Sequence, residues 1–400
     1  MTVRDEAAAI AGELAELRHA VHREPEIGLD LPRTQRKVLA ALDGLPLEIR
    51  AGKALTSVTA VLRGGEPGPT VLLRGDMDAL PVAEATGLEF ASRIDGAMHA
   101  CGHDLHTAML TGAARLLSAR QAGLAGNVIF MFQPGEEGQG GARIMIDEGV
   151  LDAAGERPVA AYGLHVMSDR DPAGVFSTRP GPMMAAVDTL RVTVRGRGGH
   201  ASRPHASADP IPAACEMVTA LQTLVTRRFD IFDPVVITVG TFHAGTVSNV
   251  IPDEATFEAT IRSFSHQARK GLEEQSARLV SYIAAGHGLV ADAQWVPGYP
   301  VTVNNASEAA FAGGCAADLF GAGRAATLAH PVPGAEDFSY VLQQVPGAFV
   351  FLGACPPGTD LATAPSNHSA RAKFDDSVLA DGTALLVELA LRRLAAAQGQ

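Results

Sequence analysis

Short apolar runs alternate with helical patterns over the first and last parts of this 400-residue chain. Apolar residues at three-to-four residue spacing predict an opening helix from Arg4 to Arg23, and a second helix is expected from Asp104 to Arg120 with Asp104 as its cap. The apolar runs, each followed by polar or glycine-rich residues, are typical of buried strands: TVLLRGDMD, NVIFMFQPGEE, VAAYGLHV and GAFVFLGAC. Strands that alternate with helices predict a largely parallel sheet covered on both faces.

The pattern changes near Val187, where apolar and polar positions alternate as in a strand with one solvated face. Helices are expected from Asp209 to Arg228 and from Gln267 to Gly286, with strands before, between and after them. This strand-helix-strand-strand-helix-strand order is that of the ferredoxin-like motif. We therefore predict an inserted domain at 186–299 and a first domain formed by 1–185 and 300–400.

The composition of the chain excludes several kinds of binding partner and indicates a cellular compartment. The net charge of -12 comes from mixed acidic and basic residues without a positive stripe, so nucleic acid and anionic membranes are poor partner candidates. No apolar run reaches the roughly 18 residues that a membrane span needs, and the start lacks the pattern of a signal peptide. The four cysteines are scattered, which favours free thiols or a metal ligand. We expect a mature cytoplasmic protein.

The densest group of chemically useful side chains is MHACGHDLHTAML, which contains Cys101 and His103. Thiolate and imidazole are the ligands that zinc and its late first-row neighbours prefer. On extended backbone, the spacing of two residues would point both side chains to the same side. A buried free cysteine beside capping or surface histidines is the alternative, and an isolated Cys-x-His motif favours that alternative.

Two adjacent acids, Glu136 and Glu137, follow another apolar run and precede several glycines. Neighbouring side chains on extended backbone diverge, so one carboxylate could bind a metal while the other acts as a general base on water. A solvated acidic turn is the alternative. Open α/β sheets gather their functional groups beyond the ends of buried strands, and this placement favours the functional interpretation.

Further candidates follow other strands. Asp76 and Asp78 come after TVLLRG, His165 comes after AYGL, and His368 lies near the C-terminus in NHSARAKFDD. These groups would converge on the Cys-His motif if their strands are neighbours. Each also has a plain interpretation, as acids that end a strand, a hydrogen-bonded core histidine or a loop histidine.

The inserted domain carries its own polar candidates. His200 and His205 lie in a glycine-led loop, Asn249 in SNVIPDEA, and Arg262 in the strand EATFEATIRSF. Imidazole and amide groups can donate hydrogen bonds to a developing oxyanion, and arginine suits a substrate carboxylate. A surface turn and an ordinary strand-face arginine agree equally well with the spacing alone.

Together these motifs resemble those of the amidohydrolase branch of the zinc-exopeptidase superfamily, which includes aminoacylases, hippurate hydrolases and indole-acetyl-amino-acid hydrolases. The resemblance covers nearly the whole chain in the family's order: HREPEIG, RGDMDALP, MHACGHDLHTAML, FQPGEEGQGGA, GLHV, GGHASRPH, SNVIPDEA, GAEDFSY and NHS. It implies an α/β fold in which a catalytic domain, built on a helix-flanked mixed sheet, is interrupted by a ferredoxin-like α+β domain. That inserted domain would serve as a lid and as a dimerisation surface.

The resemblance also implies a role for each candidate residue. Cys101 would bridge two divalent metal ions per subunit, either Zn, Mn, Co or Ni, and four other residues would complete the coordination: His103, Glu137, His165 and His368. Glu136 would be the general acid and base, and Asp78 the acid that orients a ligand. His200 looks like the lid histidine, which in related dimers can enter the partner subunit's active site, and Asn249 and Arg262 match substrate-binding positions.

One motif departs from the wider superfamily. Many relatives carry His-x-Asp where this chain has Asp76-Met77-Asp78, with that histidine as a ligand and an aspartate as the bridge. The amidohydrolase branch shifts the ligands to Cys101 and His103, so Asp76 is left out of the predicted ligand set.

The expected function is hydrolysis of the amide bond of small N-acyl amino acids, N-acetyl, N-benzoyl or similar, which releases a carboxylic acid and a free amino acid. A homodimer or tetramer assembled through the lid domain is expected. A dipeptidase, a carboxypeptidase or a biosynthetic deacetylase would share the same metal chemistry and differ mainly in the lid pocket. A non-catalytic metal-binding protein is a more distant alternative, because the base candidate Glu136 is present beside every proposed ligand.

Overall fold

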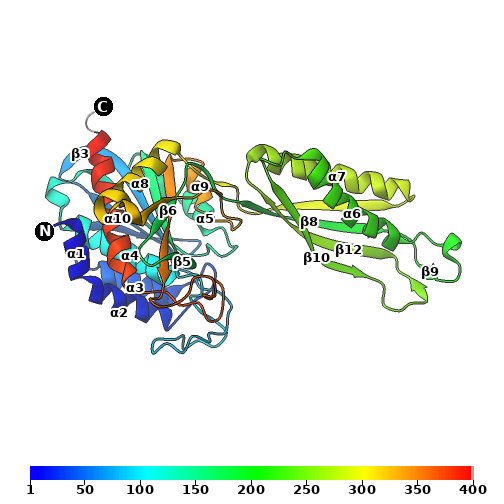
Figure 1. Ribbon diagram of the computed structural model, residues 1–400, viewed down its shortest axis with the longest axis horizontal. Helices are drawn as coiled ribbons and strands as arrows, with labels where there is room; N and C mark the ends of the chain where they lie inside the picture. The colour runs from blue at the N-terminus through cyan, green and yellow to red at the C-terminus, as the bar shows by residue number, and fades with distance from the viewer. Residues whose placement is uncertain (398–400) are drawn as a thin grey trace. The chain divides into compact units, whose positions relative to one another are not determined.

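The computed structural model describes residues 1–397, and they form two compact units (Figure 1). Unit 1 consists of Met1–Met183, Val303–His330 and the described residues from Asp337 on. Unit 2 consists of Met184–Thr302 and Pro331–Glu336. The predicted insertion spanned 186–299, and its action as a lid remains a prediction.

Unit 1 is built on a sheet of eight strands in the order β1-β2-β4-β3-β5-β16-β6-β15. The neighbours β4, β3, β5 and β16 are parallel, whereas β2 is antiparallel to both β1 and β4, and β6 is antiparallel to β16. The sheet is thus mixed, and the predicted fold class is confirmed. Its strands are β1 (Leu47–Ala51), β2 (Val58–Arg63), β3 (Glu66–Asp76), β4 (Ala125–Gln133), β5 (Ala160–Pro172), β6 (Phe176–Thr178), β15 (Ala325–Thr327) and β16 (Gly347–Cys355).

Helices cover this sheet and bury its apolar side chains. The strand β3 contacts both α4 and α10, and α4 also contacts α2. Large core side chains such as Phe130 and Tyr162 are fully buried, and each contributes about 1.5–3 kcal/mol through the hydrophobic effect. The helices are α1 (Val3–Ala9), α2 (Ala11–His22), α3 (Pro32–Leu42), α4 (His103–Ser118), α5 (Gly141–Asp147), α8 (Ala306–Phe320), α9 (Ser339–Leu342) and α10 (Val378–Ala397).

Two predictions about helices need correction. The opening helix is two helices, α1 and α2, because Ile10 leaves the helical region at φ -102° and ψ 2°. The helix α4 begins at His103 after Gly102, so Asp104 lies inside its first turn and is not the cap. Its carboxylate instead binds buried side chains of α2. None of the helices within residues 1–397 has the length and apolar character required to cross a membrane.

The parallel strands bring distant segments to one edge of the sheet. In the β3–β4 ladder, Asp76 is paired with Gln133, so the segments after these two strands start side by side. In the β5–β16 ladder, His165 is paired with Phe351. The carboxyl ends of parallel strands meet at the same edge, and this is where the candidate site residues of unit 1 gather.

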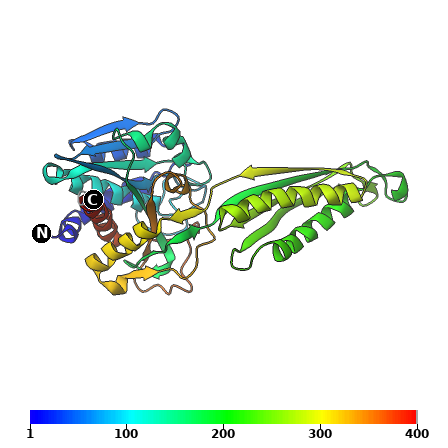
Figure 2. The same cartoon turned by 90° about the horizontal axis from the view of Figure 1, so that it is seen from above.

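Unit 2 has the predicted ferredoxin-like order and an antiparallel sheet, β10-β12-β8-β13. Buried and exposed residues alternate along β12, because α6 and α7 cover one face of the sheet (Figure 2). Its elements are β8 (Ala186–Arg195), β9 (Gly199–His200), α6 (Pro210–Arg228), β10 (Val235–Ala244), β11 (Val250–Ile251), β12 (Glu254–Ser263), α7 (His266–Gly286) and β13 (Val290–Pro297).

Short elements complete the fold. The strands β7 and β14 form a two-stranded sheet, and β9 pairs with β11. The remaining elements are β7 (Gly181–Met184), β14 (Thr302–Asn304), η1 (Gln121–Gly123), η2 (Val150–Asp152), η3 (Pro204–Ala206) and η4 (Ala322–Arg324).

A buried ionic cluster ties α2 to the start of α4. The Asp104 carboxylate accepts a hydrogen bond from Arg18 Nε at 2.9 Å and lies 2.8 Å from His22 Nδ1. All three side chains are at most 1% exposed. Burial alone would lower the pKa of His22, but the Asp104 carboxylate raises it to about 9. The imidazolium therefore stabilises the folded state at neutral pH.

This cluster predicts a pH-dependent stability. Since the pKa of His22 is raised from 6.5 to about 9, its contribution is complete below about pH 6.5 and is lost as the pH rises through 9. We expect the free energy of unfolding to decrease by about 2–3 kcal/mol over that range, measured by denaturant titration. The His22→Gln variant should lack this decrease. If the unfolding free energies of the variant and of the unmodified protein changed with pH in the same way, the role of His22 would be contradicted.

Candidate metal centre

The loop that carries the Cys-x-His motif is turned rather than extended, so that part of the prediction is wrong. Gly102 adopts a φ of 82°, which is in the left-handed region that favours glycine. A Cβ at this position would also lie 2.3 Å from Val166 Cγ2. Despite the turn, Cys101, His103 and His165 offer ligand atoms within 4.8 Å of one another, because His103 opens α4 directly after the turn.

Asp78 holds three segments of this site together. Its two carboxylate oxygens accept hydrogen bonds from the backbone N–H groups of Glu136 and Glu137, both at 3.0 Å. Its backbone carbonyl oxygen lies 2.9 Å from His103 Nδ1 and can only accept, so Nδ1 carries the proton. The lone pair of His103 Nε2 is therefore available for a ligand.

Two further histidines complete the cluster. His165 lies on β5, with its Nδ1 2.8 Å from the Val166 carbonyl oxygen and its Nε2 3.3 Å from Cys101 Sγ. His368 lies on a loop at a φ of 70°, which is uncommon for a residue with a side chain. Its Nε2 is 3.2 Å from Glu137 Oε1. The cluster thus draws on four separate parts of unit 1.

The donor atoms form two groups that share one sulfur. Cys101, His103 and His165 make one group, and Cys101, Glu137 and His368 make the other, with all ligand atoms of a group within 4.8 Å of one another. His103 Nε2 is buried and makes no hydrogen bond to any atom of residues 1–397. Such a group is costly to bury unless a ligand occupies it. Thiolate, imidazole and carboxylate are all suitable ligands for late first-row divalent metals, so these residues fit a pair of such ions.

The electrostatics also favour cations. Burial lowers the pKa of His165 well below its usual value. Burial acts in the same direction on His103, but the negative groups of Asp76 and Cys101 raise its pKa well above the usual value. Hydrogen bonds to Cys101 and Glu137 raise the pKa of His368 to about 10. The negative potential that stabilises protons on His103 and His368 also attracts metal ions, which compete with the protons.

Sequence reasoning missed Asn367, which precedes His368. Its Nδ2 donates hydrogen bonds to the carbonyl oxygens of Cys101 at 3.3 Å and Val166 at 3.0 Å. Its Oδ1 accepts the backbone N–H of Ser168 at 2.9 Å. The only available signal was its place next to a candidate histidine, since an asparagine in a loop carries no ligand chemistry of its own in this pattern.

In unit 2, the structure brings His200 and Asn249 together. Ala201 N–H donates to the Asn249 carbonyl oxygen at 3.1 Å, and His200 on β9 pairs with Val250 on β11. His200 Nδ1 accepts the backbone N–H of Ser202 at 3.1 Å. An amide N–H can only donate, so the neutral imidazole carries its proton on Nε2 and presents a hydrogen-bond donor there.

Arg262 lies near the opposite end of unit 2's sheet. It is on β12, paired with Val236 on one side and Val187 on the other, and its side chain is partly buried. The start of β12, Glu254, is eight residues away, which at about 3.4 Å per residue corresponds to about 27 Å. Since Asp253 next to that start binds the β9 segment through Gly198 N–H, one copy of unit 2 does not bring Arg262 together with His200.

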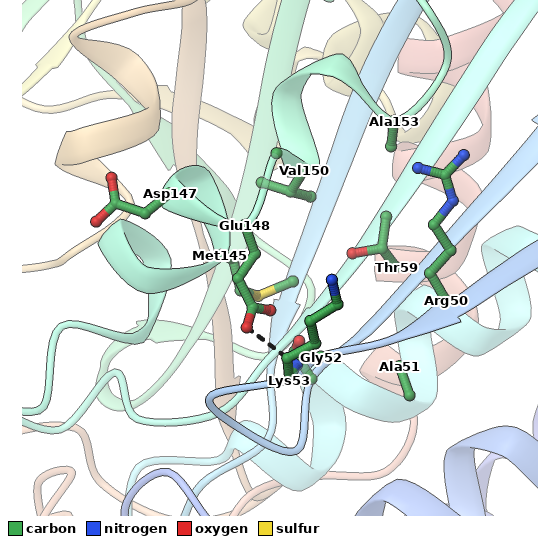
Figure 3. A pocket seen from close by; sticks show the side chains of 12 residues that line it. Arg50, Ala51, Gly52, Lys53, Thr59, Met145, Asp147, Glu148, Val150 and Ala153 are labelled. Carbon is green, nitrogen blue, oxygen red and sulfur yellow. Dashed lines mark hydrogen bonds between the residues drawn. The ribbon is translucent and has the colours of Figure 1, made fainter.

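A cavity of about 560 Å³ elsewhere in unit 1 contains none of these candidate residues (Figure 3). There, the Glu148 carboxylate accepts backbone N–H groups of Lys53 and Ala54, at 3.0 and 2.7 Å. The cavity mixes both charge signs with small and apolar side chains: Arg50, Ala51, Gly52, Lys53, Ser57, Thr59, Met145, Asp147, Glu148, Gly149, Val150 and Ala153. Within residues 1–397, no group of metal-binding or nucleophilic side chains converges on it, so the Cys101 cluster is the better candidate.

The chain is similar to several known proteins. The model of peptidase family M20/M25/M40 matches residues 72–392. The chain is 40% identical over 341 residues to the N-acetylcysteine deacetylase of Bacillus subtilis (strain 168), with 85% of this chain and 88% of that protein covered. It is 37% identical over 383 residues to thermostable carboxypeptidase 2 of Saccharolobus solfataricus, with 95% of each covered.

A solved structure agrees with the fold as well. The Bacillus subtilis YXEP protein, a dinuclear metal-binding peptidase from the M20 family, superposes with a TM-score of 0.83 at 35% sequence identity. The alignment covers 97% of this chain and 99% of that one.

The hydrogen bonds of Asp78 predict that replacing it lowers the stability of the folded protein. In an Asp78→Asn variant, the new NH2 group would face one of the two backbone N–H donors, so that donor would be left without an acceptor. We expect the metal-free protein to lose about 1–3 kcal/mol of unfolding free energy in denaturant titration. The matched control is Asp95→Asn, an exposed aspartate of the loop that precedes Cys101. Equal stability of the two variants would show that the Asp78 contacts are not needed.

Proposed function

The chain belongs to peptidase family M20/M25/M40, and on this premise we propose that it hydrolyses the amide bond of N-acyl amino acids to a carboxylic acid and a free amino acid. Family membership makes the chain a metal-dependent hydrolase. One observation carries the proposal: the backbone of Glu136 is held by Asp78 directly beside two metal-ligand groups that share Cys101. The similarity to an N-acetylcysteine deacetylase supports an acyl amino acid as the substrate.

The metal ligands are assigned from the two groups of donors. Cys101 would be shared by both ions, with His103 and His165 holding one and Glu137 and His368 the other. Zn, Mn, Co or Ni would suit these ligands. When bound, two divalent cations supply Lewis-acid charge that makes water nucleophilic near neutral pH and polarises a carbonyl group.

Glu136 is assigned as the general acid and base. Its side chain is 6% exposed, and its backbone N–H is fixed to Asp78 Oδ1 at 3.0 Å. A largely buried carboxylate on a backbone held in this way can take a proton from the attacking water and return it to the leaving nitrogen. The adjacent Glu137 is fixed by Asp78 Oδ2, so one aspartate sets the positions of both the base and a ligand. Asp78 therefore acts through its neighbours.

The candidate residues of unit 2 are assigned to substrate binding. His200 presents a proton on Nε2, which can donate to the oxyanion that develops at the amide carbonyl. Asn249, whose backbone carbonyl oxygen accepts Ala201 N–H, lies on the adjacent segment, and its side-chain amide would donate to the same substrate. Arg262 would bind the carboxylate of the amino acid part, because its guanidinium matches a carboxylate with two parallel hydrogen bonds.

The geometry of β12 supports a dimer or a larger assembly. Within one chain, Arg262 lies about 27 Å along β12 from Glu254, and the β9 segment that carries His200 is bound beyond Glu254, so a small acyl amino acid does not span the two. If both act on one substrate, they come from different subunits. We therefore propose a homodimer, or a tetramer built from such dimers, in which His200 and Asn249 serve the active site of the second copy.

A carboxypeptidase activity is the second candidate. It is favoured by the 37% identity to thermostable carboxypeptidase 2 over 95% of the chain. Peptide and acyl amide bonds would use the same ligands and the same base, so the difference would lie in the residues that contact the acyl part. The cytoplasm is the proposed location, because a thiolate ligand such as Cys101 suits a reducing compartment.

The experiment that tests the reaction uses a substrate panel. We expect hydrolysis of N-acetyl, N-benzoyl and longer-acyl amino acids that stops after chelation and returns with Zn, Mn, Co or Ni. The Glu136→Gln variant should keep its bound metal and lose turnover by a factor on the order of a hundred or more. Glu137→Gln is the matched control and should lose metal as well. Near-normal turnover by Glu136→Gln would contradict its role, and preferential cleavage of dipeptides would favour the second candidate.

The assembly proposal predicts complementation between two inactive variants. His200→Ala and Glu136→Gln should each be nearly inactive alone. Co-expressed with different tags, half of the dimers are mixed, and each mixed dimer has one site with an intact Glu136 and an intact His200 from the other copy. We expect about one quarter of the normal rate. No recovery from purified mixed dimers would show that His200 acts within its own chain.

A further inference from the structure

We infer that His106 is a positioning residue, which together with Asp76 orients the proposed metal ligand His165 by holding the backbone N–H of Val166 in place. The inference rests on the proposed function, because it concerns the metal site described there. Asp76, His103 and His106 are close enough to form a third possible metal-binding group, so His106 could be mistaken for a ligand.

The hydrogen bonds of His106 leave it no free lone pair. The Val166 backbone N–H donates to His106 Nε2 at 2.8 Å, and an amide N–H can only donate. Nε2 must therefore be the unprotonated nitrogen, and the proton must lie on Nδ1. Nδ1 is 2.5 Å from Asp76 Oδ1 and donates to it. With both ring nitrogens used, His106 cannot bind a metal without breaking one of these two bonds.

The other polar group of Val166 fixes His165. The Val166 carbonyl oxygen lies 2.8 Å from His165 Nδ1 and can only accept, so Nδ1 of His165 carries the proton. The lone pair of His165 is then on Nε2, which lies 3.3 Å from Cys101 Sγ. Asn367 Nδ2 donates to the same carbonyl oxygen at 3.0 Å. A displaced Val166 backbone would thus change both the position and the tautomer preference of His165.

Asp76 is itself held rigidly. Arg74 Nη1 donates to Asp76 Oδ2 at 2.6 Å, and Arg74 Nη2 donates to Asp337 Oδ1 at 3.1 Å. Gln133 accepts from Arg74 Nε at 2.9 Å and donates to Asp337 at 2.8 Å. All four side chains are at most 1% exposed. The carboxylate that polarises His106 therefore cannot turn away to solvent.

The experiment compares metal binding by full-length variants, with Co²⁺ as the probe. His106→Leu removes the acceptor for Val166 N–H, and we expect it to weaken binding at the His103–His165 position by about 10–100-fold while the Glu137–His368 position changes little. The d–d spectrum of the weakened position should also change. His106→Gln can place its Oε1 near the former Nε2 and should restore most of the affinity. The matched control is Thr111→Val, which removes another buried hydrogen bond of α4, from Thr111 Oγ1 to the Thr107 carbonyl oxygen.

A measurement on the unmodified protein guards against variants that fail to fold. In the metal-free protein, ¹⁵N resonances should show both His106 and His165 protonated on Nδ1, and added metal should shift the His165 Nε2 resonance while the His106 resonances stay unchanged. Metal coordination by His106, or normal Co²⁺ affinity and spectrum in His106→Leu, would overturn the inference. Failure of the acyl amino acid panel with intact Co²⁺ binding would overturn only the proposed substrate. Failure of the unmodified protein to bind Co²⁺ would overturn both.

Discussion

Three segments of the chain that are distant in sequence meet at the Asp78 carboxylate and carbonyl. The two backbone N–H groups after β4 point to its carboxylate, and the first residue of α4 points to its carbonyl oxygen. Without this residue the acids after β4 would have no fixed position relative to the Cys-x-His turn. The parallel sheet brings the segments close, but the sheet alone fixes only their starting points. The hydrogen bonds of Asp78 then fix the orientation of these segments relative to one another.

The site is surrounded by charges that are buried in pairs or triads. Arg74 lies between Asp76 and Asp337, and Arg18 and His22 lie against Asp104, which directly follows His103 in the sequence. Buried ion pairs of this kind add little net stability, because desolvation offsets much of their attraction. They do restrict geometry, since removing one partner leaves an uncompensated charge. Their positions next to the ligands agree with a role in holding the ligands still.

Much of the fold could be predicted from the periodic spacing of apolar residues along the sequence. Alternation along the β8 and β12 segments, with two helical patterns between them, was enough to predict the ferredoxin-like unit, because one face of each strand is buried and the other is not. The five proposed ligands were identified by their chemistry and by resemblance, and the structure brings their donor atoms together. The predictions that were wrong concern the local backbone conformation. The left-handed turn at Gly102 replaced the extended backbone, and Asp104 bound α2 in place of capping α4.

The residues that escaped prediction act through tertiary contacts. His106 was visible as a histidine, but its partners Asp76 and Val166 lie on different strands, and no spacing in the sequence relates the three. Asn367 was overlooked for the same reason. Residues whose role is to hold other residues have no chemical signature of their own.

The close approach of Gly102 to Val166 restricts how this sequence can change over evolutionary time. Any other residue at 102 would meet both an unfavourable φ and the Val166 methyl group. A smaller residue at 166 would relieve only the second conflict. Substitution of Gly102 alone is therefore strongly disfavoured. Sequence change in this loop would have to begin with a smaller residue at position 166 on β5.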